Sequence, residues 1–398
     1  MQNQILDQEL NEKLTNQETL KNKEVPSMEV NQNDDIIMSE EEMIKYHENE
    51  MNLSVYMEET HKSLEAAFKM GKNIILHGPG GHNKSCYSIN YLGSKGINPF
   101  VQTMGSGMTT DRLFGGIDLK EFNETGKIKY LVENSFMNQE FVIFEELFDA
   151  PDYILEQLKD ILSSGYFRDA NNTFRIKTKL IICCTNRTRV EFSKNASLAA
   201  LMERFPYECE VKWKQYNANS YSKLLTTKMG FADPLLVYIL EQFANDKTDK
   251  KIISPRIALL AAETIAELGP DYLDVIADFQ QKPQLLKDAK QKFKDINAIN
   301  TLIKDIQTEH VASKALYTEC NNNLTPENIE AINLTITKLT DLIDKLSKIK
   351  KPEEKATECV TLEKTIKTHI EAVKAYLQVS EIVSEMESDS EDLTFDVE

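Results

Sequence analysis

The sequence predicts an α/β core built on a parallel sheet, followed by a helical lid and then by a C-terminal bundle of long helices. Three apolar runs, each followed by a glycine-rich or polar segment, are typical of buried strands in such a sheet; they cover 73–77, 141–144 and 179–185. Beyond residue 283, apolar residues recur three and four apart over long stretches. That spacing indicates long amphipathic helices.

The chain has 398 residues, which is enough for two or three domains with cores of their own. Its net charge of −18 lies almost entirely at the ends. Residues 1–50 carry thirteen acids against four lysines, residues 381–398 carry eight acids and no base, and the body between them is nearly neutral at −1. Because a large nucleic-acid interface usually needs a basic patch or stripe, we expect no nucleic-acid partner.

We expect the protein to be cytoplasmic and to have no membrane span. No apolar run approaches the ~20 residues that a membrane-spanning helix needs, and the first ten residues (MQNQILDQEL) lack the pattern of a signal peptide. The six cysteines are scattered without C-x-x-C spacing, which is typical of reduced thiols.

Residues 73–85 (NIILHGPGGHNKS) carry the first apolar strand into a glycine-rich turn that ends on a lysine and a hydroxyl. Such a turn lets backbone N–H groups point at phosphate oxygens, and the following helix adds positive potential. We expect Gly78 and Gly81 to shape the turn. Lys84 would then reach the β and γ phosphates of a nucleoside triphosphate, and Ser85 would ligate magnesium. An ordinary glycine turn between strand and helix is the alternative for this segment alone.

The turn departs at one place from the G-x-x-x-x-G-K-[ST] pattern of phosphate loops. That pattern has glycine before the lysine, whereas this chain has Asn83. Asparagine is the non-glycine residue that best tolerates left-handed backbone angles, so we keep Asn83 among the nucleotide-binding residues.

The second apolar run ends in two carboxylates, Glu145 and Glu146. A carboxylate at a strand end can hold a magnesium ion, and its neighbour can orient and deprotonate an attacking water. We assign Glu145 to the metal and Glu146 to the water. Taken alone, two adjacent acids after a strand are most often a solvated turn.

Three further polar residues follow in an order that suits the same site. Asn186 comes directly after the third apolar run, where its amide could bond the γ-phosphate or the attacking water; a lone asparagine there is usually a turn former. Open parallel sheets bind ligands at the carboxyl ends of their strands, which favours the functional role. Arg204 lies at a helix end, and Arg256 lies just inside a helix that opens with a serine cap and a proline. Either arginine could be an ordinary surface residue.

The whole order resembles that of an AAA+ ATPase and, within that superfamily, of the MoxR family. The resemblance covers roughly residues 55–280. It is carried by GPGGHNKS (78–85), TTDRLFGGIDL (109–119), FEELFDAP (144–151), CTNRT (184–188), LMERF (201–205) and SPRIALL (254–260).

This resemblance implies a role for each polar residue. Arg204 resembles the arginine finger that reaches the γ-phosphate of a neighbouring subunit, Asn186 the sensor-1 residue and Arg256 the sensor-2 residue of the lid. Family members usually have aspartate where this chain has Glu145. The segments 119–136 and 169–177 resemble the two insert hairpins that such ATPases aim at a central pore.

The resemblance also implies the activity and the partners. It implies an enzyme that hydrolyses ATP with Mg²⁺, forms a hexameric ring and remodels or loads a protein client, often together with a von Willebrand A-type partner. The choice of ATP over GTP rests on this resemblance alone.

We divide the chain into a mostly disordered acidic segment (1–50), the AAA+ core (51–214), the helical lid (215–283), a helical bundle or hairpin (284–380) and an acidic disordered tail (381–398). The lid helices each open at a proline; they cover 234–243, 255–268 and 270–279.

The bundle shows its clearest apolar stripe over the helix that starts at Pro326 and stops before Pro352. The stripe is more easily explained as the core of the bundle than as a groove for a partner. His310 and His369 have no second ligand one helical turn away, so we assign no metal to them.

Two other classes of function stay open. A nucleotide-binding interaction scaffold with little hydrolysis would fit the departures at Asn83 and Glu145. A GTP-driven DNA-translocating motor is a minor third possibility. The joint presence of the lysine, the second acid, the asparagine and both arginines favours an ATPase, because a scaffold has no evident need for all of them.

Overall fold

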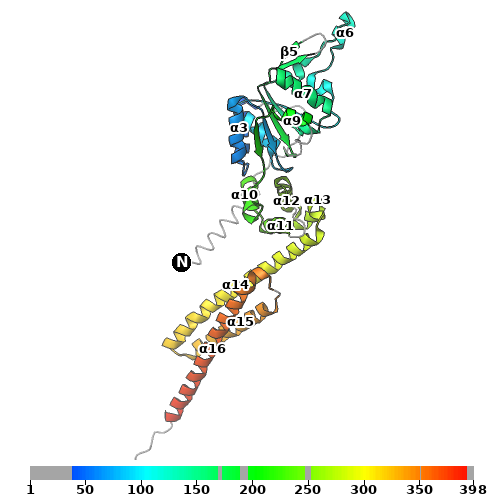
Figure 1. The fold of residues 1–398 in the computed structure, drawn as a ribbon. Helices are drawn as coiled ribbons and strands as arrows, with labels where there is room; N and C mark the ends of the chain where they lie inside the picture. The colour runs from blue at the N-terminus through cyan, green and yellow to red at the C-terminus, as the bar shows by residue number, and fades with distance from the viewer. Residues whose placement is uncertain (1–37, 169–172, 189–195, 247–251, 350, 392–398) are drawn as a thin grey trace, which may run out of the picture.

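The computed structural model describes residues 38–168, 173–188, 196–246, 252–349 and 351–391 (Figure 1). Its centre is a five-stranded sheet in which every pair is parallel, in the order β2-β3-β6-β1-β7. The strands are β1 (Ile74–His77), β2 (Phe100–Thr103), β3 (Phe141–Glu145), β6 (Leu180–Thr185) and β7 (Tyr207–Glu210). The predicted α/β core with a parallel sheet is therefore confirmed.

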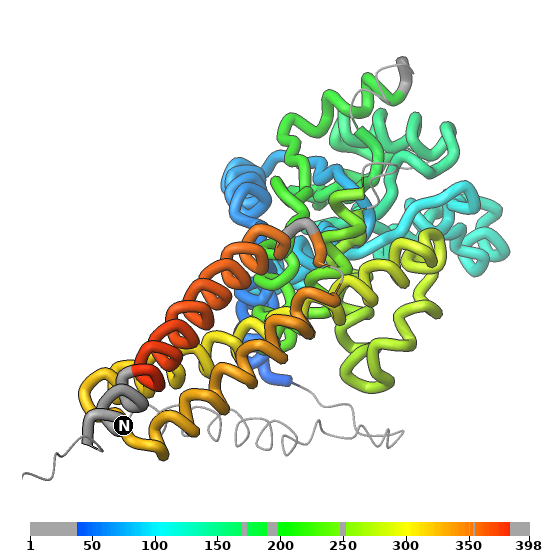
Figure 2. The backbone as a smooth tube through the Cα atoms, turned by 90° about the horizontal axis from the view of Figure 1, so that it is seen from below, coloured from blue at the N-terminus to red at the C-terminus, as the bar shows by residue number. Residues whose placement is uncertain are grey.

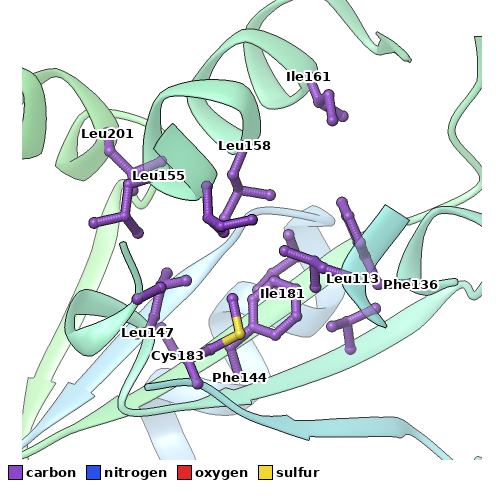
Figure 3. Close-up of a cluster of buried hydrophobic side chains, with 14 of the residues drawn as sticks. Leu113, Phe136, Phe144, Leu147, Leu155, Leu158, Ile161, Ile181, Cys183 and Leu201 are labelled. Carbon is purple, nitrogen blue, oxygen red and sulfur yellow. The ribbon is translucent and has the colours of Figure 1, made fainter. Parts of the chain in front are cut away.

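Both faces of the sheet are buried, and the alternation along β6 shows this directly. Ile181 and Cys183 point into one hydrophobic cluster, shown in Figure 3, where they meet Leu155 and Leu158 of α7 (Asp152–Ser164). The alternate residues Leu180, Ile182 and Cys184 belong to a second cluster on the opposite face, together with residues of α3 (Glu58–Met70) and α4 (Lys84–Gly93). A strand buried on both sides needs apolar residues at every position, which explains its continuous apolar run.

The predicted insert at 119–136 contains a short helix, α6 (Leu119–Thr125), which follows α5 (Thr110–Phe114). The Asp118 side chain accepts hydrogen bonds from two backbone N–H groups of its first turn, and Gly126 ends it with φ 69°. The chain then returns to pair Tyr130 with Ile117. The segment is thus a short helix followed by a return segment that makes one isolated β-bridge.

The second predicted insert lies next to an antiparallel pair, β4 (Tyr166–Arg168) and β5 (Thr173–Arg175). Residues 169–172 lie outside the described residues. In Figure 1, α6 and β5 are drawn at the end of the core that faces away from the long helices. The helix α9 (Ala196–Met202) precedes β7.

Four helices and a 3₁₀ segment form a compact group after the sheet. They are α10 (Ala218–Met229), α11 (Pro234–Asn245), α12 (Pro255–Leu268), the 3₁₀ segment Pro270–Val275 and α13 (Ala277–Gln280). Ser254 caps α12 ahead of its proline, as the sequence predicts, and Asp233 caps α11 in the same way. The stretch expected to be one helix from Pro270 instead divides into the 3₁₀ segment and the four-residue α13.

Three long helices follow and run side by side away from the core (Figures 1 and 2). They are α14 (Pro283–Asn322), α15 (Pro326–Lys348) and α16 (Glu353–Glu391). Their shared core includes the stripe of α15. The first turns of α14 also bury Leu286 and Ala289 against the helices of the lid, so one continuous helix belongs to both groups.

The described residues include helices in both terminal segments that we expect to be disordered. The helix α2 (Glu40–Asn52) lies within the segment expected to be mostly disordered, because Ser39 and Glu42 form a capping box and His47 bonds Asn90 of α4 at 2.9 Å. The helix α16 continues into the predicted acidic tail as far as Glu391. Residues 1–37 and 392–398 lie outside the described residues.

No helix in the described part of the chain combines the length and the apolar composition that crossing a membrane requires. All six cysteines are free thiols, and only Cys86 is exposed.

Candidate functional site

A cavity of about 610 Å³ opens between the carboxyl ends of β1, β3 and β6 and the lid. It brings together most of the residues that the sequence singles out. Its lining includes Gly81, Asn83, Lys84, Ser85, Glu145, Glu146, Asn186 and Arg256. Neither Gly78 nor Arg204 lines it, although the carbonyl oxygen of Gly78 accepts a hydrogen bond from the lining residue Lys84.

Two glycines allow the turn after β1 to lie close to its neighbours. Gly78 has φ 146°, and a Cβ atom there would overlap the carbonyl oxygen of Val211. Gly81 has φ 74°, and a Cβ atom there would lie 2.6 Å from the hydroxyl oxygen of Ser254. Any larger residue would clash at both positions, so these glycines are required by the close approach of the backbone.

Asn83 adopts the left-handed conformation, with φ 65° and ψ 20°. This is the backbone geometry for which asparagine is the best substitute for glycine. Its amide nitrogen also donates to the hydroxyl of Ser54 at 3.0 Å, a bond that glycine could not make. The departure from the phosphate-loop pattern therefore leaves the turn intact and adds a contact to the segment after α2.

The ammonium group of Lys84 is held at the centre of the site. Its Nζ donates to the carbonyl oxygens of Gly78 (2.7 Å) and Pro79 (2.9 Å) and to Oδ1 of Asn186 (2.9 Å). Lys84 is only 7% exposed, and burial lowers its pKa. The three acceptors are neutral, so they orient the positive charge without cancelling it. Such a group is well suited to an anionic ligand.

The two adjacent acids point to different partners. Glu145 ends β3, and its Oε2 accepts a hydrogen bond of 2.6 Å from the hydroxyl of Thr103 at the end of β2. Glu146 has a left-handed backbone with φ 50°, and its Oε2 accepts from the backbone N–H of Asn186 at 3.3 Å. A left-handed glutamate is uncommon and is found mainly where structure or function demands it.

The oxygen atoms that the side chains of the cavity provide suit magnesium, which shares its coordination with phosphate and water, better than a metal that is coordinated by protein side chains alone. The described residues contain no group of three or more His, Cys, Asp or Glu side chains that could hold a metal ion. Mg²⁺ typically takes one or two carboxylates together with phosphate oxygens and water. The Glu145 carboxylate and the Ser85 hydroxyl line the same cavity and provide such oxygen ligands.

Arg256 and Arg204 have different positions relative to this cavity. The backbone N–H of Arg256 donates to the carbonyl of Gly81 at 3.3 Å, which joins the start of α12 to the phosphate loop. Arg204 lies just beyond α9, where its Nε and Nη2 both donate to the hydroxyl of Ser163 on α7, at 3.0 and 2.9 Å. It also pairs with the neighbouring Glu203 at 3.1 Å. The structure thus groups Arg256 with the other site residues of its own chain and leaves Arg204 outside.

Sequence analysis missed several residues of the site. Thr103 ends β2, whose residues alternate between half-buried and exposed and so lack a continuous apolar run. His82 occupies a position of the loop pattern that accepts any residue. Trp213 also lines the cavity, and its neighbour Tyr216 bonds His82 across a separation of 134 residues. A contact between residues so far apart in the sequence produces no local sequence pattern from which it could be predicted.

The strand order and the grouped residues define an AAA+ ATPase domain. Residues 44–232 match a family model described as the MoxR domain in the MoxR-vWA-beta-propeller ternary systems. This part of the chain therefore belongs to the MoxR family of AAA+ ATPases.

The chain also resembles solved structures of NtrX from Brucella abortus. One shares 15% identity over 66% of this chain and 65% of that chain, with a TM-score of 0.38. The complex with ATP shares 12% identity over 76% of this chain and 73% of that chain, with a TM-score of 0.41. The complex with ADP shares 13% identity over 66% and 67%, with a TM-score of 0.40. No curated protein matches the chain.

Proposed function

We propose that this protein hydrolyses ATP as a hexameric ring, as its family likeness implies, and uses the cycle to remodel or load a protein partner. The observation that carries the proposal is the meeting of Lys84, Ser85, both acids, Asn186 and Arg256 around one cavity. A phosphate-binding cation, oxygen ligands for a metal and a carboxylate near a polar sensor are the parts that phosphoryl transfer requires.

The hydrolytic step follows from the positions of these side chains. The phosphate-loop N–H groups and Lys84 bind the triphosphate. Ser85 and Glu145 would hold magnesium, which would supply positive charge to the phosphate oxygens. Glu146 accepts the proton of the attacking water, and the backbone N–H of Asn186 holds its carboxylate at 3.3 Å. Arg256 connects the nucleotide site to the lid through its backbone bond to Gly81.

Arg204 supports the ring. Within one chain its guanidinium is bonded to Ser163 and Glu203 and does not line the cavity. We infer that it completes the site of a neighbouring subunit, where it neutralises charge developing on the γ-phosphoryl group.

The partner is proposed from the family. The matching model describes MoxR domains that act in systems with von Willebrand A and β-propeller components. We propose a protein client, with a von Willebrand A-type protein as the partner. The six free thiols support a cytoplasmic location.

A steady-state hydrolysis assay with ATP and GTP tests the proposal. We expect turnover of ATP in the wild type, and Glu146→Gln should preserve nucleotide binding while nearly abolishing turnover, because an amide cannot accept the proton of water. Turnover by Glu146→Gln at the wild-type rate would show that this acid is not the base.

A scaffold that binds nucleotide and scarcely hydrolyses it is the second candidate. The departure at Glu145 favours it, because family members usually have aspartate at the position assigned to the metal. Tight ATP binding without turnover by the wild type, with the ring assembled, would select this candidate.

A further inference from the structure

His82 lies in the phosphate loop and is almost completely buried, at 4% exposure. Its Nδ1 lies 2.9 Å from the carbonyl oxygen of Gly80, and its Nε2 lies 2.7 Å from the hydroxyl oxygen of Tyr216. A carbonyl can only accept, so Nδ1 carries the proton. Burial lowers the pKa of His82 and favours the neutral ring, so Nε2 accepts from the Tyr216 hydroxyl.

The hydrogen-bond chain continues into the linker between β7 and α10. The Tyr216 oxygen accepts from the backbone N–H of Trp213 at 3.3 Å. The Tyr216 and Trp213 rings are stacked, with centroids 5.4 Å apart and an angle of 21° between their planes. Trp213 also packs against Tyr221 of α10 at 5.5 Å. The loop histidine is therefore bonded to the segment from which the lid begins.

Consecutive residues of the loop are tied to three separate parts of the chain. Gly81 accepts from the backbone of Arg256 at the start of α12, and Asn83 donates to Ser54 after α2. His82 lies between them and makes the bond to the linker through its side chain. Three hydrogen bonds thus connect the loop to segments that are distant in sequence.

We propose that His82 is a positioning residue that fixes the phosphate loop to the start of the lid through Tyr216 and so sets the affinity for nucleotide. This proposal rests on the proposed binding of a nucleoside triphosphate. The loop binds phosphate through its backbone N–H groups, which must all point into the cavity together. The hydrogen bond to the linker keeps the N–H groups in that arrangement. A change in the conformation of the linker would therefore change the conformation of the loop.

Three substitutions separate the two bonds of the imidazole. Tyr216→Phe keeps the ring and removes the hydroxyl. In His82→Asn the amide takes the place of Nδ1 but does not reach Tyr216, whereas in His82→Gln the longer amide takes the place of Nε2 and does reach it. We expect Tyr216→Phe and His82→Asn each to raise the Kd for a fluorescent ATP analogue about fivefold, the effect of one net hydrogen bond.

The double variant decides whether the two residues act through each other. His82→Asn combined with Tyr216→Phe should bind no more weakly than either single variant, and His82→Gln should recover most of the lost affinity. Tyr221→Phe is the matched control, since it keeps the neighbouring ring and removes a buried hydroxyl that donates to the carbonyl of Ile253 at 2.8 Å instead of to His82. Its effect should add to that of His82→Asn.

Hydrogen exchange tests the link without nucleotide. Backbone N–H groups of residues 80–85 should exchange faster in Tyr216→Phe than in Tyr221→Phe. If the wild type binds no nucleotide, the proposed function fails, but faster exchange would still support the link. Unchanged exchange in Tyr216→Phe, or additive losses of affinity for His82→Asn and Tyr216→Phe, would overturn the proposal.

Discussion

Glu145 and Glu146 are neighbours in sequence, yet the backbone directs them to different strands. Glu145 continues β3 and is bonded to Thr103 of β2, while the left-handed turn at Glu146 brings its carboxylate to the end of β6. The two acids therefore occupy separate places in one cavity. Such a division lets one carboxylate serve the metal while the other serves the water.

The role of Glu145 can be tested through its partner. Thr103→Val keeps the shape of the side chain and removes the hydroxyl that holds the Glu145 carboxylate. We expect Thr103→Val to weaken nucleotide binding several-fold with Mg²⁺ present and to leave binding in EDTA unchanged, and Glu145→Gln to have the larger effect. Binding titrations with and without Mg²⁺ measure this. An equal loss under both conditions would assign Glu145 to structure rather than to the metal.

At the scale of elements, α15 shows that the apolar stripe of a helix determines which of its side chains are buried. Ile336 and Ile343 are buried in the core of the three long helices, whereas Leu334 on the same helix is 57% exposed. We propose that residues 284–380 form a unit that can unfold separately from the core.

Charged substitutions in α15 test that separation. Ile336→Asp together with Ile343→Asp should loosen the long helices, since each buried charge costs several kcal/mol, while the core continues to bind nucleotide. Leu334→Asp, on the exposed side, should change little. Circular dichroism and nucleotide binding, measured on the same samples, decide it; loss of binding together with helicity would show that the bundle is integral to the core.

The long helices also contain a pair of histidines that makes their stability depend on pH. His310 and His369 have ring centroids 4.8 Å apart, and Ser313 lies 3.0 Å from Nε2 of His369. Burial lowers the pKa of both, and Lys314 lowers them further. The folded pair therefore stays neutral at a pH where the unfolded chain is already protonated.

The sign of the effect follows from this difference. Near pH 7.5 both states are neutral, but below about 6.5 the unfolded histidines take up protons first, so the free energy of unfolding falls. We expect thermal melting of the wild type between pH 7.5 and 5 to show a steeper loss than that of a variant carrying His310→Gln and His369→Gln. Parallel curves would mean that this pair does not set the pH dependence.

The elements differ in how well the sequence predicts them, for physical reasons. β3 and β6 are buried on both faces, so their apolar runs are visible without the structure. β2 is only partly buried and leaves no such run. The caps and prolines of α11 and α12 mark their starts, whereas α10 has neither a proline nor a strong apolar stripe. The phosphate loop could be predicted because its chemistry is local, and the bond between His82 and Tyr216 could not.

At the scale of the whole molecule, Arg204 connects one chain to the next in the proposed ring. If it acts in trans, Arg204→Ala should keep nucleotide affinity near wild type and lower hydrolysis by roughly 10³-fold or more. Ser163→Ala, which removes only the hydroxyl that holds Arg204 within its own chain, should remain active.

Mixing the variants provides the decisive measurement. Adding Arg204→Ala to Glu146→Gln should restore activity wherever an intact acid and an intact arginine meet across one interface, once fluorescence transfer has shown that subunits exchange. An arginine acting within its own chain would give no recovery. Full activity of Arg204→Ala in a demonstrated monomer would reject the ring mechanism.

The uninterrupted course of α14 has a mechanical consequence. Its 40 residues span about 60 Å at 1.5 Å per residue, and its first turns are embedded in the lid. A rigid rod of that length turns a small rotation at its base into a large displacement at its tip: a lid rotation of about ten degrees would carry the far end through about 10 Å. If the lid rotates during the proposed cycle, we expect the displacement at the far end of the long helices to be set by the angle through which the lid turns.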